Sequence, residues 1–202
     1  HCPESIAVNI LIIKPSSIGD IIHALPAVQL LRVHFPDAYI VWLVNDAFSD
    51  LVDMFPCVDE SILFKRKRLG NPRHWHEIGS FLHELRRYKY DVTLDFQGLL
   101  RSGVMSYLST ATRRIGFNDA REGAPLFYTE KTPVPANLHH AVDKNIFLVR
   151  SAFGISEPAP LPNIHIPHDA RKLANRLLCD ASISDRSPLI AVAPGARWRT
   201  KQ

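Results

Sequence analysis

The feature that most constrains the fold is the alternation of short apolar segments with longer segments of helical periodicity. The apolar segments are rich in β-branched residues and predict buried strands. They lie at residues 6–13, 39–44, 61–64, 91–96 and 113–117. The helix-like segments lie at 19–34, 47–55, 75–88, 100–110 and 139–153, and 118–138 looks irregular. This order predicts an α/β fold, a mostly parallel sheet in a doubly wound, Rossmann-like domain.

A proline-rich segment divides the chain. Residues 154–168 contain four prolines, which is typical of a linker. A helix-like segment at 169–179 and an apolar segment with a Pro-Gly loop at 187–198 follow, and they predict the start of a second Rossmann-like domain. The predicted parts are a first domain at 1–155, a linker at 156–168 and an incomplete second domain at 169–202.

Composition narrows the function classes. A net charge of +4 is mildly basic and favours an anionic partner. Three separated cysteines argue against a disulfide framework or a zinc site, and they fit a reducing, cytoplasmic compartment. No apolar stretch reaches the roughly 20 residues that cross a bilayer. The basic loops accompany no nucleic-acid-binding motif, so we expect no nucleic acid partner.

The loop after the first strand carries the first candidate site. Ser17, Gly19 and Asp20 follow the strand and open a helix, where ligands bind in open α/β sheets. Gly19 permits close approach of a ligand. A structural interpretation stays open, in which Ser17 caps the helix and Asp20 only complements its dipole. The absence of GxGxxG and of a Walker motif argues against a nicotinamide cofactor and a Walker-type phosphate loop.

A second candidate site follows residues 91–96. Asp95 and Gln97 offer hydrogen bonds to a polyhydroxylated ligand, and Arg101 could bind an anion. A strand end followed by a helix cap explains the same residues equally well.

Positive charge gathers on loops that we expect around the same crevice. It comes from Lys65, Arg66, Lys67, Arg68, Arg113, Arg114 and Arg121. At the end of the chain, Arg197, Thr200 and Lys201 follow a Pro-Gly turn and suit a phosphate, although an ordinary surface turn fits them too. The histidines form no convincing ligand frame, so no metal site is predicted.

Five segments taken together resemble a known family. They are KPSSIGDIIHALPAV, LDFQGLLRS, RIGFNDAREGAPLFYTEK, HHAVDKN and VAPGARWRTKQ. They are similar to the ADP-heptose:lipopolysaccharide heptosyltransferases of glycosyltransferase family 9, most of all to heptosyltransferase I.

This resemblance implies a GT-B architecture, with an acceptor-binding first domain and a second domain that binds the nucleotide sugar. It implies inverting transfer of heptose from ADP-heptose to the Kdo region of lipopolysaccharide, without a cofactor or an obligatory metal. Asp20 matches the proposed catalytic base, whereas Arg121 and the loop at 65–68 match regions that meet acceptor anions. Thr200 and Lys201 would approach the donor phosphates.

The resemblance also implies a location and a limit. A Kdo-lipid A acceptor suggests peripheral attachment to the cytoplasmic face of the inner membrane. A complete member needs a full second domain, so we expect this chain alone to bind acceptor without turnover. The alternatives are a related transferase with another nucleotide sugar or acceptor, and a non-catalytic module that binds anions or lipids.

Overall fold

The computed structural model describes residues 8–65, 75–183, 189, 190 and 192. The chain separates into two compact units, His1–His165 and Ile166–Gln202. The first unit contains every strand of the described part of the chain.

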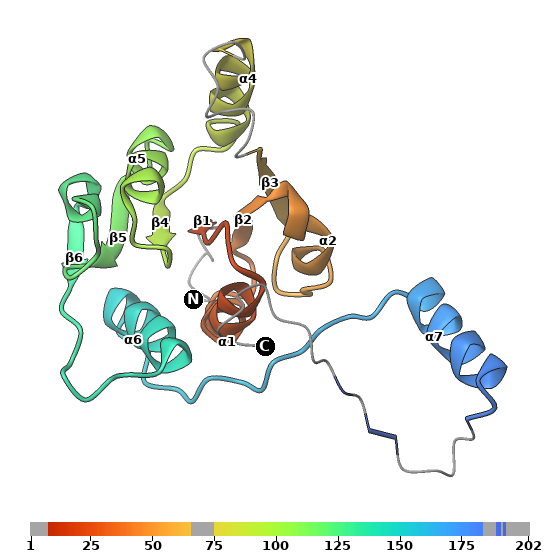
Figure 1. Ribbon diagram of the computed structural model, residues 1–202. Helices are drawn as coiled ribbons and strands as arrows, with labels where there is room; N and C mark the ends of the chain where they lie inside the picture. Colours follow the sequence, from red (N-terminus) through yellow and green to blue (C-terminus); the bar gives the residue numbers. More distant parts are fainter. Residues whose placement is uncertain (1–7, 66–74, 184–188, 191, 193–202) are drawn as a thin grey trace, which may run out of the picture. The chain divides into compact units, whose positions relative to one another are not determined.

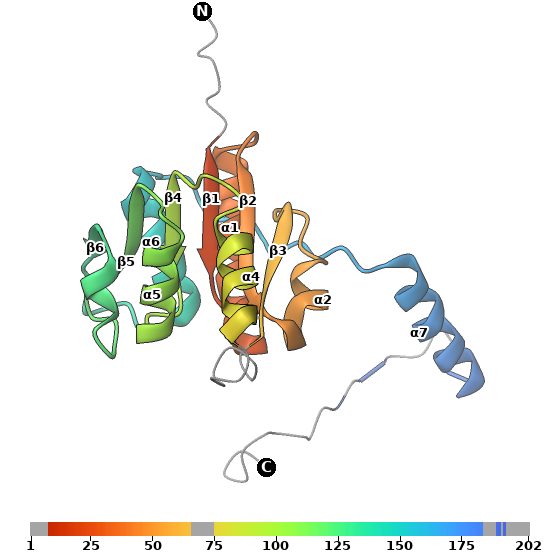
Figure 2. The same cartoon turned by 90° about the horizontal axis from the view of Figure 1, so that it is seen from above.

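The first unit is built on one parallel sheet. Its strands are β1 (Asn9–Ile13), β2 (Tyr39–Asn45), β3 (Glu60–Phe64), β4 (Val92–Asp95), β5 (Arg113–Phe117) and β6 (Glu130–Thr132). Their order across the sheet is β3-β2-β1-β4-β5-β6, and the strands lie side by side in Figure 2. The chain therefore reverses its direction of travel across the sheet between β1 and β4. This reversal is characteristic of a doubly wound sheet, so the predicted Rossmann-like topology is confirmed. In such folds, ligands bind at the point where the strand order reverses.

Helices cover both faces of the sheet (Figure 1). One face packs against α1 (Ile18–His34), α2 (Ser49–Val52), which follows the short turn η1 (Asp46–Phe48), and α6 (Ala141–Phe153). The other face packs against α4 (Trp75–Leu85) and α5 (Leu100–Leu108).

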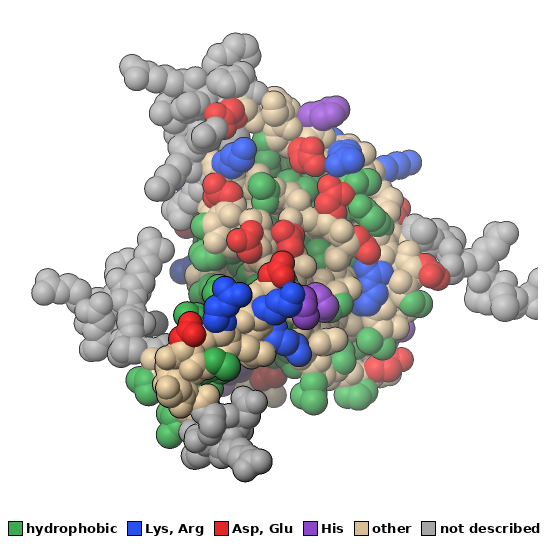
Figure 3. Space-filling view, turned by 90° about the vertical axis from the view of Figure 1, so that its right-hand side faces the viewer, with side chains coloured by type: hydrophobic (Ala, Val, Ile, Leu, Met, Phe, Trp, Pro, Cys, Tyr) green, Lys and Arg blue, Asp and Glu red, His purple; other side chains and the backbone are tan. Residues whose placement is uncertain are grey.

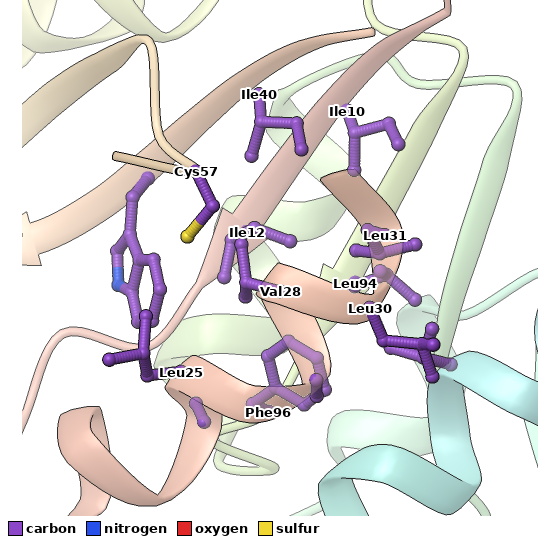
Figure 4. Close-up of a cluster of buried hydrophobic side chains, with 14 of the residues drawn as sticks. Ile10, Ile12, Leu25, Val28, Leu30, Leu31, Ile40, Cys57, Leu94 and Phe96 are labelled. Carbon is purple, nitrogen blue, oxygen red and sulfur yellow. The ribbon is translucent and has the colours of Figure 1, made fainter. Parts of the chain in front are cut away.

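The alternation of side chains along each strand builds a core on both faces. Ile10 and Ile12 of β1 pack under α1, whereas Leu11 and Ile13 pack on the opposite face. Figure 4 shows the first cluster, in which Leu25 and Val28 of α1 meet the strand side chains and Cys57. Because both faces are covered, the strands read as continuous apolar runs rather than as an alternating pattern.

Helix α1 contains a proline, Pro26, in its interior. The helix continues through Pro26, and that ring is buried. A proline inside a helix removes one backbone hydrogen bond. Its burial among the apolar side chains of α1 supplies packing that opposes this cost.

The segment at 118–138 contains structure that the sequence did not indicate. A short turn, η3 (Ala124–Phe127), leads into β6, which pairs in parallel with β5. The three residues of β6 are Glu, Lys and Thr, and they carry no apolar signal. The expectation of an irregular segment is wrong at this point, because β6 pairs with β5 through backbone groups, which leave no apolar pattern in the sequence.

Tyr128 packs directly on β5. Its ring lies against Gly116, where a Cβ atom would collide with the ring. Gly116 is the register partner of Asp95 on the adjacent strand. The Tyr128 hydroxyl donates a hydrogen bond of 2.6 Å to Asp95 Oδ2. The missing side chain at Gly116 therefore lets Tyr128 reach across β5 to β4.

The proline-rich segment is attached to the first unit as far as His165. The Gln29 side chain donates to the Asn163 carbonyl oxygen at 3.0 Å, and the His165 N–H donates to the Met54 carbonyl oxygen at 2.7 Å. The predicted domain limits at residues 155 and 168 stay predictions.

The described part of the second unit is α7 (His168–Asp180) with the residues near it. Leu189, Ile190 and Val192 are exposed and belong to no strand, so the expectation of a buried strand is wrong for these three residues. The other residues of 187–198 lie outside the described residues.

The described surface has no wide patch of one charge on the face shown in Figure 3, where acidic and basic side chains are interspersed. No helix within the described ranges is both long and apolar enough to span a membrane.

We predict that Gly116→Ala lowers the free energy of unfolding by about 1–3 kcal/mol, because the new methyl group overlaps the Tyr128 ring. Urea denaturation measures the change. Gly79→Ala on α4 is the matched control, since a Cβ there meets nothing within 4 Å, and it should leave stability unchanged or raise it by up to about 1 kcal/mol. Equal stability of the two variants would contradict the packing of Tyr128 on Gly116.

Candidate functional site

Two pockets lie at the carboxyl ends of the central strands. The first pocket has a volume of about 330 Å³ and is bounded by the ends of β1, β4 and β5 and by the first turns of α1 and α6. Its lining residues are Lys14, Asp20, His23, Phe96, Gln97, Phe117, Arg121, Ala141, Lys144 and Asn145. It therefore contains one carboxylate among four side chains that can carry positive charge.

Asp20 lies in the first turn of α1. The backbone N–H and the hydroxyl of Ser17 each donate a 2.8 Å hydrogen bond to Asp20 Oδ2. Ser17 is therefore the N-cap of α1, as the structural interpretation of the sequence proposed, and Asp20, at the third position of the helix, accepts from it. Its other oxygen, Oδ1, accepts no hydrogen bond from any residue that the structure describes, so one carboxylate oxygen stays available to a ligand.

Several influences act on the pKa of Asp20. Partial burial raises it, but the two hydrogen bonds from Ser17 and the nearby charges of Lys14 and His23 together lower it below the ordinary value. The carboxylate is therefore ionised at neutral pH.

Lys14 forms the floor of the first pocket. It ends the apolar run of β1 and is only 8 % exposed. Its ammonium group donates to the Phe96 carbonyl oxygen at 3.0 Å. Burial lowers the pKa of Lys14, while the carboxylates of Asp20 and Asp95 oppose that shift. A cation that is mostly desolvated attracts an anion more strongly than an exposed one does.

The remaining polar side chains reach the first pocket from other elements. The backbone N–H of Arg121 donates to the Gly98 carbonyl oxygen at 2.9 Å. This hydrogen bond joins the loop after β5 to the loop after β4. On α6, the Asn145 side chain donates to the His23 carbonyl oxygen at 3.1 Å and fixes the start of α6 against α1. Lys144, which precedes Asn145 at the start of α6, therefore lines the same pocket as Asp20.

The second pocket has a volume of about 260 Å³ and lies beside the first. Its lining residues are Pro15, Ser16, Asn45, Phe64, Gln97, Leu99, Arg101, Ser102, Met105 and Glu122. Gln97 lines both pockets. The sequence placed Arg101 and Arg121 at one crevice, but the structure separates them into neighbouring pockets.

Asp95 does not reach either pocket. It is fully buried, and its oxygens accept hydrogen bonds from Tyr128 Oη and from the N–H groups of Gln97 and Gly98. Burial raises the pKa of Asp95, and these hydrogen bonds oppose the shift. The expectation that Asp95 binds the acceptor directly is wrong in this arrangement, because its hydrogen-bonding capacity is used within the fold.

Arg113 and Arg114 also differ from their expectation. They begin β5, so they lie at the amino-terminal end of the strands, whereas the pockets lie at the carboxyl ends. Arg113 forms an ion pair with Glu130 at 2.6 Å, and Arg114 donates to the carbonyl oxygens of Phe127 and Ala111. Their charges stabilise the fold rather than the crevice.

The other predicted residues are placed as follows. Ser17 and Gly19 are exposed beside the first pocket but do not line it. Lys65 lines a separate hollow between β3 and α4. Arg66, Arg68, Arg197, Thr200 and Lys201 lie outside the described residues.

Sequence reasoning missed Lys14, His23 and Lys144. Lys14 carried a usable signal, because it is the charged residue that ends the first apolar run. Lys144 lies within HHAVDKN, a segment of the family resemblance, but nothing in the sequence assigned it a role, since the packing of α6 against α1 brings it to the pocket. No group of three His, Cys, Asp or Glu side chains in the described part of the chain is arranged to hold a metal ion.

The family model for glycosyltransferase family 9 (heptosyltransferase) matches residues 78–202. The chain belongs to glycosyltransferase family 9. The matched range contains Gln97, Arg101, Arg121 and Lys144 of the two pockets, while Asp20 precedes it.

Curated relatives of this family 9 chain are named lipopolysaccharide heptosyltransferase 1. The protein from Pseudomonas aeruginosa is 28 % identical over 200 residues, which cover 96 % of this chain and 54 % of the relative. The protein from Escherichia coli K12 is 29 % identical over 159 residues, which cover 74 % and 49 %. The chain thus spans about half the length of the curated relatives it matches.

Two solved structures have the same fold. Escherichia coli heptosyltransferase WaaC with ADP-2-deoxy-2-fluoro heptose matches with a TM-score of 0.69 at 28 % identity, over 77 % of this chain and 51 % of that one. The family 9 glycosyltransferase from Veillonella parvula matches with a TM-score of 0.74 at 20 % identity, over 89 % and 51 %. The fold of the family 9 chain is therefore that of one half of these GT-B proteins.

We predict that Ser17→Ala raises the pKa of Asp20 towards its ordinary value, because one of two hydrogen bonds to the carboxylate is lost. A lowered native pKa stabilises the fold above the pKa of the unfolded chain, and this contribution is lost as pH falls through the native pKa. The variant should therefore lose about 1 kcal/mol at neutral pH and less in acid.

Carboxyl-carbon NMR titration measures this pKa, and denaturation at several pH values measures the stability. Ser151→Ala, at an exposed position on α6, is the control and should leave the Asp20 titration unchanged. An unshifted Asp20 pKa in Ser17→Ala would show that the hydroxyl bond does not hold the carboxylate ionised.

Proposed function

We propose that this chain forms the acceptor-binding half of a heptosyltransferase that transfers heptose from ADP-heptose to the Kdo region of lipopolysaccharide. The observation that carries the proposal is the ionised Asp20 carboxylate in a pocket lined by Lys14, Arg121 and Lys144. The names of the curated relatives support the reaction class, and the heptose donor analogue named with WaaC supports the donor.

The charges of the first pocket favour an acidic sugar as acceptor. Kdo carries a carboxylate, and Lys and Arg side chains bind carboxylates through charge-assisted hydrogen bonds. Lys14 supplies a buried cation, and Arg121 and Lys144 supply cations from two other elements. The acceptor carboxylate would meet these cations while a hydroxyl group turns towards Asp20.

The proposed chemistry requires one proton acceptor. The acceptor hydroxyl oxygen attacks the anomeric carbon of heptose, the bond from that carbon to the ADP oxygen breaks, and the configuration inverts. Asp20 Oδ1 takes the hydroxyl proton as the new bond forms. A carboxylate with a lowered pKa is a weak base, but the hydroxyl proton becomes acidic only in the transition state, where a positioned base is effective.

The donor is expected to bind outside the described residues. Arg197, Thr200 and Lys201 would meet the phosphates of ADP-heptose and stabilise the departing diphosphate. This assignment rests on the sequence, as does the expectation that no metal is needed. Peripheral contact with the inner face of a membrane also stays a prediction.

We predict that Asp20→Asn lowers the transfer rate by about 10² to 10⁴-fold, because the proton acceptor is lost. Acceptor affinity should change little, since the Asn side chain keeps the size and one hydrogen-bond acceptor. Mass spectrometry of Kdo-lipid A incubated with ADP-heptose measures transfer. The assay uses the product of the whole reading frame, since we expect residues 1–202 alone to bind acceptor without turnover.

Asp50→Asn is the matched control, because Asp50 is an exposed carboxylate in the first turn of another helix. It should leave transfer unchanged. An Asp20→Asn variant that retains full activity would exclude Asp20 as the base, and binding of acceptor without transfer by any form would favour a non-catalytic module.

We predict that Arg121→Gln weakens Kdo binding by about 10- to 100-fold, because one charge-assisted hydrogen bond to the carboxylate is lost. Calorimetric titration of the chain with the methyl glycoside of Kdo measures the affinity. Lys131→Gln is the control, since Lys131 is exposed on β6 and lines neither pocket. Unchanged affinity in Arg121→Gln would remove the acceptor carboxylate from the first pocket.

A further inference from the structure

Hydrogen bonds join the loop after β4 to the connection between β5 and β6. The backbone N–H of Arg121 donates to the Gly98 carbonyl oxygen at 2.9 Å. Further along the same connection, the Tyr128 hydroxyl donates to Asp95 Oδ2 at 2.6 Å. The position of each of these two segments therefore depends on the other.

The link between Tyr128 and Asp95 is buried, with exposed fractions of 6 % and 0 %. The second carboxylate oxygen, Oδ1, accepts from the N–H groups of Gln97 at 2.8 Å and Gly98 at 3.0 Å. One oxygen is thus held by the hydroxyl, and the other holds the loop. A buried carboxylate that loses a donor is strongly destabilised unless it moves towards another donor. Loss of the hydroxyl should therefore shift the carboxylate and the loop that is bonded to it.

Gly98 passes this constraint on to Arg121. Its φ angle is +63°, and a Cβ atom there would lie 3.2 Å from the Cβ atom of Ala120. The backbone of Gly98 is therefore packed against the residue before Arg121 and accepts the Arg121 N–H. A continuous path of contacts leads from Tyr128 through Asp95 and Gly98 to Arg121.

The Arg121 guanidinium has no other support within the described part of the chain. Its side chain is exposed, lines the first pocket, and forms no hydrogen bond or ion pair with a described residue. Its reach into the pocket is therefore set by the position of its backbone. A charged group that is already in place binds more tightly than one that must be ordered on binding.

We propose that Tyr128 is a positioning residue for the acceptor. Its hydroxyl, acting through Asp95 and the Gly98 backbone, holds Arg121 where it meets the acid group of the sugar in the first pocket. Tyr128 lines neither pocket, so it acts only through other residues. Asp20 lies on α1, outside this path, so Tyr128 affects acceptor binding rather than the chemical step. This inference rests on the proposed function.

The first test removes the hydroxyl with Tyr128→Phe in the whole chain. Calorimetric titration with the methyl glycoside of Kdo should show affinity about three- to tenfold weaker, because Arg121 keeps its charge but loses its fixed position. Thr93→Val is the matched control, since it removes a buried hydrogen bond of 3.0 Å to Ser109 from the same strand. The control should lower stability and leave the affinity unchanged.

A double variant assigns the effect to Arg121. In the Arg121→Gln background, Tyr128→Phe should weaken binding by less than about twofold, because the group that it positions is already absent. A loss of the same factor in both backgrounds would show that the hydroxyl acts on the pocket by another route, and it would overturn the proposal.

A second pair of variants disturbs the path without touching the core. Gly98→Ala places a methyl group against Ala120 and strains a positive φ angle, so it should also weaken binding by about threefold or more. Gly154→Ala is the matched control, because Gly154 has a φ angle of +67° at the end of α6 and open space around its Cβ position. It carries the same backbone strain and should leave the affinity unchanged.

Kinetics separate a positioning role from a merely structural one. In the product of the whole reading frame, Tyr128→Phe should raise the KM for the acceptor by the factor seen in binding and keep kcat within about twofold. A fold that is only destabilised would lower kcat through loss of active enzyme and leave KM unchanged, and that result would overturn the proposal.

The outcomes also separate this inference from the proposed function. Unchanged affinity in folded Tyr128→Phe and Gly98→Ala variants would overturn the positioning role and leave the acceptor function intact. Failure of the unmodified chain to bind the Kdo glycoside would overturn the acceptor function and this inference together. Circular dichroism checks the folding of each variant.

Discussion

The hydrogen bonds of the buried Asp95 carboxylate hold the loop on which both pockets depend. This carboxylate accepts from Tyr128 and from the N–H groups of Gln97 and Gly98, and the Gly98 carbonyl oxygen then accepts from Arg121. A buried carboxylate is tolerated only when such partners replace water. Gln97 and Arg121, which line the first pocket, are thus held in place by a group that lines neither pocket.

The two interpretations of Asp20 turn out to be compatible. The bonds from Ser17 that cap α1 reach one carboxylate oxygen and keep the group ionised, while the other oxygen stays free for chemistry. Helix capping therefore supplies both the orientation and the charge state that a base at this position needs. The sequence alone set these roles against each other because spacing does not reveal how a carboxylate divides its two oxygens.

Much of the fold could be predicted because apolar strands and amphipathic helices leave strong local patterns. The short polar strand β6 left none, and the sequence did not reveal that the Asp95 side chain turns inward, since an acid at the end of a strand looks the same whether it meets ligand or core. Arg113 and Arg114 were misplaced although they begin the predicted strand at 113–117, because the residues that begin a parallel strand lie at the end of the sheet opposite the pockets. Lys144 depended on the packing of two helices distant in sequence.

Gly116, Tyr128 and Asp95 restrict one another's identity. A side chain at residue 116 would remove the space that the Tyr128 ring fills, and a phenylalanine at residue 128 would leave Asp95 without its hydroxyl donor. A tyrosine without Asp95 would in turn bury a hydroxyl that has lost its acceptor. These three positions should therefore covary among related chains, and a chain that changes one of them alone would need a different support for the loop between its pockets.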